Sequence, residues 1–240
     1  LVSSSATPPS VPSIASTVRA NPTAGFSIIN HVGTNAAATF GHGLNAAPEF
    51  LIFKNRDATD NWFVWSKAAD GTATTGGILN SSNAFFTGSA NELNSTLPTS
   101  SVISVAANLA TNGNNQDVIT YAFAPVAGYS KFGSYTGNGS ADGPFVYTGF
   151  KTRWPMIKSS SNSGEDWLIL DTARDTYNDG NSSSLYASLS HADNSTTMIT
   201  TDILSNGFKP RATNAAINAS GYTYIYAAFA ESPIKYARAR

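Results

Sequence analysis

The runs ITYAFAP at residues 119–125 and YIYAAFA at residues 224–230 are similar, and they decide the fold that the sequence predicts. Both are rich in Ile, Tyr and Phe, and the apolar segments of this chain are short and bounded by Gly, Asn and Pro, as β-strands are. Tyr alternates with other residues along 222–226 and therefore occupies one face of a strand. No window of about a dozen residues shows the helical period. The sequence therefore predicts an all-β fold, with at most a helical turn near residues 89–93 or 212–218.

A spacing of about 105 residues relates further segments to each other. AGFS at residues 24–27 returns as AGYS at residues 127–130, and NWFVW at residues 61–65 returns as DWLIL at residues 166–170. This period is too long for a solenoid repeat and fits a sandwich domain of about 100 residues. The pattern therefore predicts two tandem β-sandwich domains, jelly-roll-like and related by internal duplication.

The two domains are expected at residues 23–126 and 127–240, after an extended arm or linker at residues 1–22. This first segment is rich in Pro and Ser. Proline lacks the N–H that a strand ladder needs and favours the polyproline II conformation. The segment is either a flexible leader without a role or an arm that orders against a neighbouring subunit. Because the chain opens at Leu1 rather than Met, it is either processed or a fragment of a longer polypeptide.

Composition restricts the classes of partner. Charged residues make up only 12% of the chain and the net charge is −1, so Ser, Thr, Asn and Gly must supply most of the polar surface. The Lys and Arg residues are scattered rather than clustered in a basic patch, so no nucleic-acid partner is expected. No apolar run approaches the roughly 20 residues of a membrane helix, so no membrane insertion is expected. The absence of Cys excludes disulfides, thiol catalysis and thiolate metal sites.

No converging set of catalytic or metal-binding residues is evident in the sequence. His31, His42 and His191 lack the spacing of a metal site, so we interpret them as turn or surface residues. Glu165 and Asp166 are adjacent and point to opposite faces of a strand, whereas glycosidases need two converging carboxylates. We therefore expect no enzyme activity, no cofactor and no metal ion.

One loop partly matches a calcium-binding pattern. Asp175, Asp179 and Gly180 fall at its first, fifth and sixth positions, but Tyr177 and Tyr186 stand where oxygen ligands belong. A plain turn through Asn-Asp-Gly-Asn explains the same residues.

The tryptophans leave two interpretations open. Trp62, Trp65, Trp154 and Trp167 recur at related positions in the two repeats, which favours packing in the core. The alternative is an exposed platform on which sugars stack. The candidates for contact with a glycan or a partner are Trp65, Trp154, Tyr177 and Asp179.

Several runs resemble a family. They are AGFSI at residues 24–28, GHGL at residues 41–44, GSYTGNGSADGPFVYTGF at residues 133–150, DILSNGFK at residues 202–209, and YIYAAFAE at residues 224–231. Together they resemble a β-rich repeat domain of tail-fibre and virion structural proteins from marine and environmental tailed phages.

One residue departs from the family pattern. Pro155 stands where relatives tend to have an apolar residue after the tryptophan. The strand at this position is therefore expected at a sheet edge, or to begin after the proline.

The resemblance implies a phage virion context and no catalytic residues. The expected function is that of a virion structural protein, either a tail-fibre or tail-associated module for adhesion or assembly, or a capsid decoration. Its expected location is the extracellular particle, and its expected partners are further copies of itself, other virion proteins and a host surface glycan. Two alternatives stay open: a glycan-binding module that recognises host polysaccharide, and a bacterial surface or fibre protein.

Overall fold

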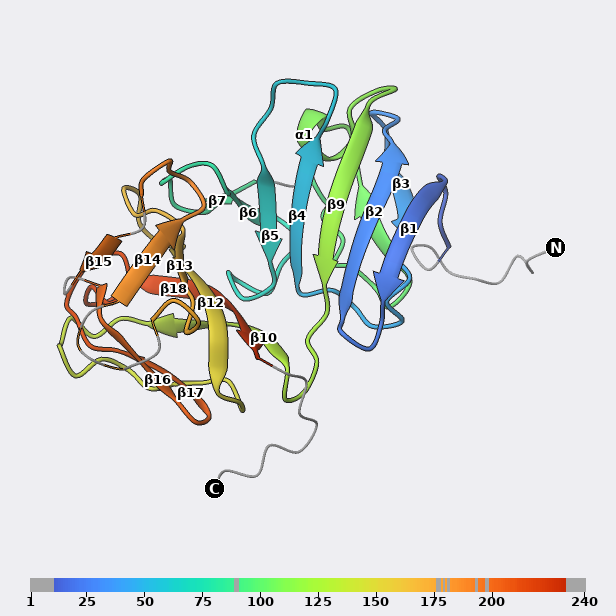
Figure 1. Cartoon of the computed structure of the whole chain (residues 1–240). Helices are drawn as coiled ribbons and strands as arrows, with labels where there is room; N and C mark the ends of the chain where they lie inside the picture. The colour runs from blue at the N-terminus through green and yellow to red at the C-terminus, as the bar shows by residue number, and fades with distance from the viewer. Residues whose placement is uncertain are drawn as a thin grey trace. The chain divides into compact units, whose positions relative to one another are not determined.

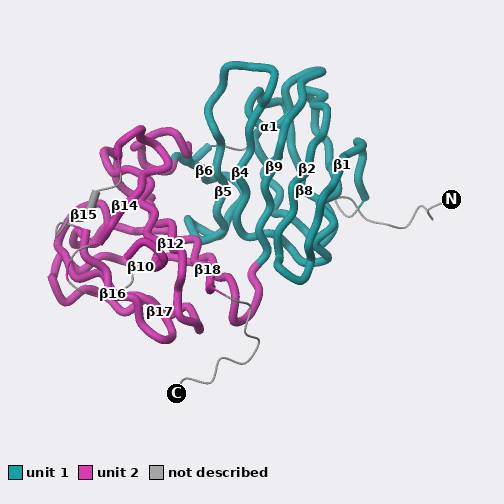
Figure 2. Tube along the Cα trace, viewed as in Figure 1, with its two compact units in different colours: residues 1–77, 86–124 teal, residues 78–85, 125–240 magenta. Residues whose placement is uncertain are grey.

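The computed structural model describes residues 11–88, 91–175, 178, 180, 182–192, 194–196 and 199–231. The protein is all-β, with 41% of its residues in strands and 2% in helix, and none of its sheets closes into a barrel. The chain divides into two compact units (Figure 2). Unit 1 consists of residues 1–77 and 86–124, and unit 2 consists of residues 78–85 and 125–240.

The main sheet of unit 1 is antiparallel and has seven strands (Figure 1). Their spatial order is β1 (Ser16–Asn21), β2 (Phe26–Val32), β9 (Asp117–Phe123), β4 (Phe50–Asn55), β5 (Phe63–Ser66), β6 (Thr75–Ile78) and β7 (Phe86–Thr87). A second sheet pairs β3 (Ala38–Gly41) with β8 (Val102–Val105). The short helix α1 (Leu109–Asn112) follows β8 and begins at an Asn108 cap. Phe40 of β3 stacks on His31 of β2 with ring centroids 4.2 Å apart, so the core lies between the two sheets.

The main sheet of unit 2 has six strands. Their spatial order is β10 (Ser130–Thr136), β18 (Thr223–Ala230), β12 (Thr152–Ser159), β13 (Leu168–Leu170), β14 (Ser182–Tyr186) and β15 (Asn194–Thr196). A smaller sheet contains β11 (Val146–Tyr147), β17 (Gly207–Pro210) and β16 (Thr201–Leu204). Phe208 of β17 packs with Tyr224 and Tyr226 of β18 in one buried cluster between these sheets. The predicted tyrosine face of this strand is thereby confirmed.

The structure differs from the expectations, or adds to them, at several places. Residues 16–21 are not part of a free arm, because they form β1 and pair with β2 over six positions. Residues 78–85 belong to unit 2, which a division of the chain at residue 126 did not foresee, and the division itself falls between residues 124 and 125. A helical turn does lie within residues 212–218, where the Asn218 N–H donates to the Asn214 carbonyl at 2.8 Å, as predicted, whereas the helix α1 at residues 109–112 was not foreseen. Four strands run as a meander in each main sheet, from β4 to β7 and from β12 to β15, which does not confirm a jelly roll.

The strand that contains Pro155 lies inside the sheet, between β18 and β13, so the prediction of an edge strand was wrong. β12 starts at Thr152, before the proline, and its register with β18 shifts between Thr152 and Trp154. β13 pairs with β12 only at Met156 and Ile157. A proline is tolerated at this point because no β13 residue is paired opposite it.

Candidate functional site

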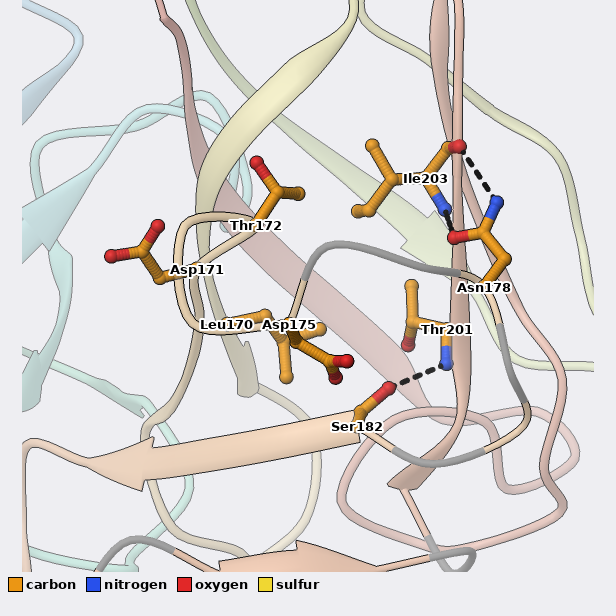
Figure 3. Close-up of a pocket in the computed structure, with 8 residues that line it drawn as sticks. All are labelled: Leu170, Asp171, Thr172, Asp175, Asn178, Ser182, Thr201 and Ile203. Atoms are coloured by element: carbon orange, nitrogen blue, oxygen red, sulfur yellow. Dashed lines mark hydrogen bonds between the residues drawn. The ribbon is translucent and has the colours of Figure 1, made fainter.

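A small polar recess lies in unit 2, where the segment after β13 approaches β14 and β16 (Figure 3). Its cavity volume is only about 20 Å³, which is room for about one water molecule. The residues that line it are Leu170, Asp171, Thr172, Asp175, Asn178, Ser182, Thr201 and Ile203. Strand ends and a turn therefore supply hydroxyl, amide and carboxylate groups at one place.

Side-chain hydrogen bonds to the backbone hold the walls of this recess. The Asn178 side chain donates to the Ile203 carbonyl and accepts from the Ile203 N–H, both at 3.0 Å. The Ser182 hydroxyl oxygen accepts from the Thr201 N–H at 3.1 Å. One carboxylate oxygen of Asp175 accepts from the Ser183 N–H at 2.8 Å. These bonds replace strand pairing where the sheets end, as polar side chains do at turns.

The Thr201 hydroxyl is the unsatisfied group of the recess. Thr201 is only 6% exposed, and its Oγ1 has no hydrogen-bond partner among the described residues. In Figure 3 this oxygen lies on the side of the Ser182 hydroxyl and the Asp175 carboxylate. A buried hydroxyl without a partner costs about 1–3 kcal/mol of stability. One hydroxyl group of a ligand that reaches into the recess would satisfy it, because hydroxyls both donate and accept.

Asp171 does not complete a cation site here. One of its carboxylate oxygens accepts from Arg153 Nε at 3.0 Å and from the Ala173 N–H at 2.8 Å. Within the described part of the chain, no three His, Asp or Glu residues are grouped as metal ligands. Hydroxyl and amide groups make up most of the described polar lining of the recess.

The four predicted contact residues have different outcomes. Trp65 is 1% exposed and its indole N–H donates to the Thr72 carbonyl at 2.9 Å, so no face of its ring is available on the surface. Its strand β5 is buried on both faces, so Trp65 packs in the core, as the favoured interpretation of the tryptophans predicted. Trp154 is half-buried and packs on Phe229 with ring centroids 5.8 Å apart, away from the recess lining. Tyr177 and Asp179 lie outside the described residues.

Two histidines expected in turns or on the surface are buried instead. His31 Nε2 lies 3.1 Å from the Thr111 carbonyl oxygen, and His42 Nε2 lies 3.1 Å from the Thr99 carbonyl oxygen. Burial lowers the pKa of His31 to about 4, and the bond to Thr111 only partly opposes this effect. Burial also lowers the pKa of His42. Both rings therefore stay neutral and hold the backbone.

Sequence reasoning missed a buried lysine. The Lys158 side chain is enclosed, and its ammonium group donates to the Ser159 carbonyl at 2.8 Å and to the Ser82 carbonyl at 3.4 Å. Burial lowers its pKa to about 8, although Asp166 and Glu165 oppose the shift. No pattern in the sequence indicated that Lys158 is buried, because segment 78–85 reaches Lys158 only through the tertiary fold.

A pair of exposed aromatic rings was also missed. Phe145 is 49% exposed and Tyr147 is 57% exposed, and their centroids lie 6.4 Å apart. The Lys131 ammonium group donates to the Tyr147 carbonyl at 2.7 Å and lies 5.0 Å from the centre of the Tyr147 ring. The run of polar residues and glycines around these rings was the signal that could have indicated exposure.

These features define an all-β, sandwich-like protein in which many polar side chains bind the protein's own backbone. The family described as a domain of unknown function, DUF7483, matches residues 2–233, and the chain therefore belongs to this family. Neither a curated protein nor a solved structure matches the chain. Across the described residues, no helix is long and apolar enough to cross a membrane.

Proposed function

We propose that this protein is a structural component of a tailed-phage particle, built from two copies of one β-sandwich domain. Within the particle, a tail-fibre or tail-associated module for assembly or adhesion is favoured over a capsid decoration. The observation that carries the proposal is that both units repeat one strand order around the same buried polar group. Such a chain presents a duplicated scaffold rather than a single reactive centre.

The strand orders support the duplication. Unit 1 contains the order β2-β9-β4-β5-β6-β7, and unit 2 contains the order β10-β18-β12-β13-β14-β15. β2 follows residues 24–25 and β10 follows residues 127–128, and both of these segments read Ala-Gly. β2 pairs with β9 and β10 pairs with β18, so in each unit the strand after Ala-Gly pairs with a strand more than 80 residues away. Two unrelated domains would rarely share such long-range connections.

One buried asparagine in each unit makes the same contacts. Asn112 Nδ2 donates to the Ala36 carbonyl at 2.7 Å and to the Ala106 carbonyl at 3.0 Å. Asn218 Nδ2 donates to the Ser140 carbonyl at 2.7 Å and to the Ala212 carbonyl at 3.0 Å. Each side-chain oxygen also accepts one backbone N–H at 2.9 Å. In unit 1 the asparagine joins the loop after β2 to the segment before β9, and in unit 2 it joins the loop after β10 to the segment before β18. We call this place in each unit the loop crossing.

Neighbouring positions support the same equivalence. His31 Nε2 contacts the carbonyl of the residue before Asn112, and the Tyr135 hydroxyl donates to the carbonyl of the residue before Asn218. A Cβ atom on Gly33 would lie 2.2 Å from the Gly113 carbonyl oxygen, and one on Gly137 would lie 2.2 Å from the Ala219 carbonyl oxygen. Glycine is therefore required at both crossings.

The assignment to a phage particle rests on the resemblance of residues 133–150, 202–209 and 224–231 to the tail-fibre family. In the structure these runs contribute β10, β11, β16, β17 and β18, which supply much of the unit 2 core. The low charge suits proteins that pack against many neighbours, because few ions must lose water at each contact.

The test is the location of the protein. Antibodies against the purified chain are applied to phage particles from the host that carries the gene, and gold label is scored by electron microscopy. Label on the tail or fibres is expected, label on the head would assign a capsid decoration, and label on the bacterial surface alone would identify a bacterial fibre protein. Particles without label would contradict the proposal.

A second candidate function is glycan binding through the recess of unit 2, and the unsatisfied Thr201 hydroxyl favours it. Titration calorimetry with polysaccharide fragments from the host surface measures this binding. Thr201→Val removes the hydroxyl at nearly constant shape and is expected to abolish binding. Thr120→Val, which removes an unpartnered buried hydroxyl in unit 1, is the matched control and should leave binding intact.

A further inference from the structure

A similar turn occurs in both units, and it allows the residues before it to be matched. Gly43 in unit 1 and Gly149 in unit 2 have positive φ angles of 70° and 90°. The N–H that follows Gly43 donates to His42 Nδ1 at 3.2 Å, and the N–H that follows Gly149 donates to Thr148 Oγ1 at 3.4 Å. The two turns therefore share a left-handed glycine and one side-chain bond, which fixes how the preceding residues correspond.

Counting back from the two turns matches one outward flank in each unit. Gly41 corresponds to Tyr147, and Thr39 corresponds to Phe145. In each unit the residue between these two positions is buried. Because successive side chains along a strand point to opposite faces, the matched residues lie on the outward face. We call Phe145 and Tyr147 the aromatic flank of unit 2.

In unit 1 the segment before β1 lies along the matching flank. The Thr39 carbonyl accepts from the Ser13 N–H at 2.8 Å, and the Thr39 hydroxyl donates to the Val11 carbonyl at 2.7 Å. A Cβ atom on Gly41 would lie 3.5 Å from Pro12 Cγ, so the proline ring packs beside this glycine. The flank of unit 1 therefore binds a segment of chain that contains a proline.

The aromatic flank of unit 2 is exposed, and its rings are held in place by the protein. Lys131 Nζ lies 5.0 Å from the centre of the Tyr147 ring on one side. On the other side the Phe145 ring leans over Gly207, since a Cβ atom there would lie 3.1 Å from Phe145 Cε2. Rings that are already positioned lose little freedom when a partner binds. The flank is therefore a preformed apolar surface.

Composition indicates which kind of segment suits this surface. Asp142 is the only charged residue within residues 133–150, and residues 1–18 contain none. A contact between segments of these two kinds removes few charges from water, which is otherwise costly. Residues 9–12 read Pro-Ser-Val-Pro, a spacing found in proline-rich segments that dock on aromatic side chains. The chain thus contains an example of a suitable ligand.

Unit 2 has no segment of its own at the matching place in the chain. Residues 11–13 of unit 1 lie 13 to 15 positions before β2, which starts at Phe26. The same distance before β10, which starts at Ser130, gives residues 115–117, and these lead into β9 of unit 1. The segment that corresponds to residues 11–13 is therefore already used in the other unit.

We propose that the aromatic flank of unit 2 binds an uncharged, proline-containing segment of another protein chain, with a proline ring packed on Tyr147. The proposal rests on the duplication argued above, because the match to unit 1 identifies the kind of occupant. It extends the assembly role, since it names the surface through which unit 2 contacts a partner and the chemistry of that partner.

Binding of a labelled peptide tests this surface. The peptide has the sequence of residues 9–18, PSVPSIASTV, and its fluorescence anisotropy is followed as the intact chain is added. Saturable binding is expected, and Tyr147→Ala should weaken it about tenfold or more, because the substitution removes the ring on which the proline packs. Tyr147→Phe keeps the ring and should keep the binding. Phe86→Ala removes an exposed ring of unit 1 and is the matched control.

Two further measurements separate this contact from other causes. A peptide in which alanine replaces both prolines should bind about tenfold more weakly. Thermal unfolding of Tyr147→Ala should match that of the intact chain, because the side chain is exposed. No binding of the peptide, equal binding of the alanine peptide, or unchanged affinity in Tyr147→Ala would each overturn the proposal.

A glycan is the other occupant that the test can reveal. If Tyr147→Ala abolished binding of a host polysaccharide fragment while the peptide did not bind, the flank would be a glycan site and the proposal would be wrong. Label on phage particles tests the proposed function separately. That label would still support a particle protein if the peptide failed to bind, and its absence would contradict that function even if the peptide bound.

Discussion

Unit 1 and unit 2 place an asparagine with the same bonds at the same loop crossing, but they finish their main sheets differently. Asn112 and Asn218 are both fully buried, and each donates to two backbone carbonyls. By contrast, β1 pairs with the outer side of β2, whereas β10 is the outermost described strand of its sheet. The interior of the proposed repeat is therefore kept while its edge changes. This difference teaches that the folding requirement lies at the crossing, whereas the sheet can end in different ways.

The largest effect is expected from the asparagines. Asn112→Ala and Asn218→Ala each leave buried carbonyls without donors, so each should lower the unfolding free energy of its own unit by about 4 kcal/mol. Hydrogen–deuterium exchange read by mass spectrometry measures the two units separately. Asn114→Ala, at an exposed position nearby, should change exchange little. If only one of the two substitutions destabilised its own unit, the proposed equivalence would be contradicted.

The next largest effect is a loss of stability at low pH, which is expected in unit 1 and not in unit 2. Folded unit 1 keeps His31 neutral, because its pKa is lowered from 6.5 to about 4, so the unfolded chain alone binds a proton between these values. Stability is thus fully present above pH 6.5 and is lost as the pH falls towards 4. At about 1.4 kcal/mol per pH unit, the loss from His31 reaches about 3 kcal/mol.

Tyr135 takes the corresponding place in unit 2, and burial raises its pKa well above the usual range, so it contributes no such loss in acid. Urea unfolding at pH 7 and pH 4.5, followed by exchange in residues 26–32, checks the effect. His31→Gln should flatten the pH dependence of unit 1, and His191→Gln, at an exposed position, should not. A pH dependence that survives His31→Gln unchanged would refute this cause; His42, whose pKa is also lowered, is then the next group to vary.

A smaller effect concerns the segment that unit 2 takes from the first half of the chain. Trp167 is 1% exposed, its indole N–H donates to the Ile78 carbonyl at 2.8 Å, and its ring lies 5.9 Å from that of Phe85. Phe85→Ala should lower the stability of unit 2 by about 2 kcal/mol and shift tryptophan emission to longer wavelength. The neighbouring Phe86→Ala is the control, because Phe86 is 38% exposed. Equal effects of the two substitutions would show that segment 78–85 does not cover Trp167.

The smallest effect has the opposite sign. Thr120→Val in unit 1 and Thr201→Val in unit 2 each remove a buried hydroxyl without a partner, so each should raise stability by about 1 kcal/mol. Thermal unfolding measures the gain. If the recess binds a glycan, only the Thr201 variant should also lose the stabilisation that added glycan gives. A destabilised Thr201→Val protein would show that its hydroxyl has a partner in the folded state.

The candidate site was less predictable than the fold. Asp175 and its turn were noticed from spacing alone, but Thr201 and Ser182 carry no sequence signal and reach the recess only because β16 lies beside the start of β14. For Trp65 the recurrence of the tryptophans favoured packing in the core, which its burial in β5 confirms, and the alternative of an exposed platform is wrong for this residue. Burial depends on what covers a strand, which local patterns do not record.

The sequence by itself determined the local features of this protein. The short apolar runs determined strands, the period of about 105 residues indicated two similar units, and the low charge argued against nucleic acid. Only the tertiary structure decided that β1 pairs with β2, that β10 is the outermost described strand of its sheet, and that residues 78–85 join unit 2. The physical reason is that strand periodicity is set by the few residues within a strand, whereas pairing and burial join residues such as Phe26 and Phe123 that lie far apart in the chain.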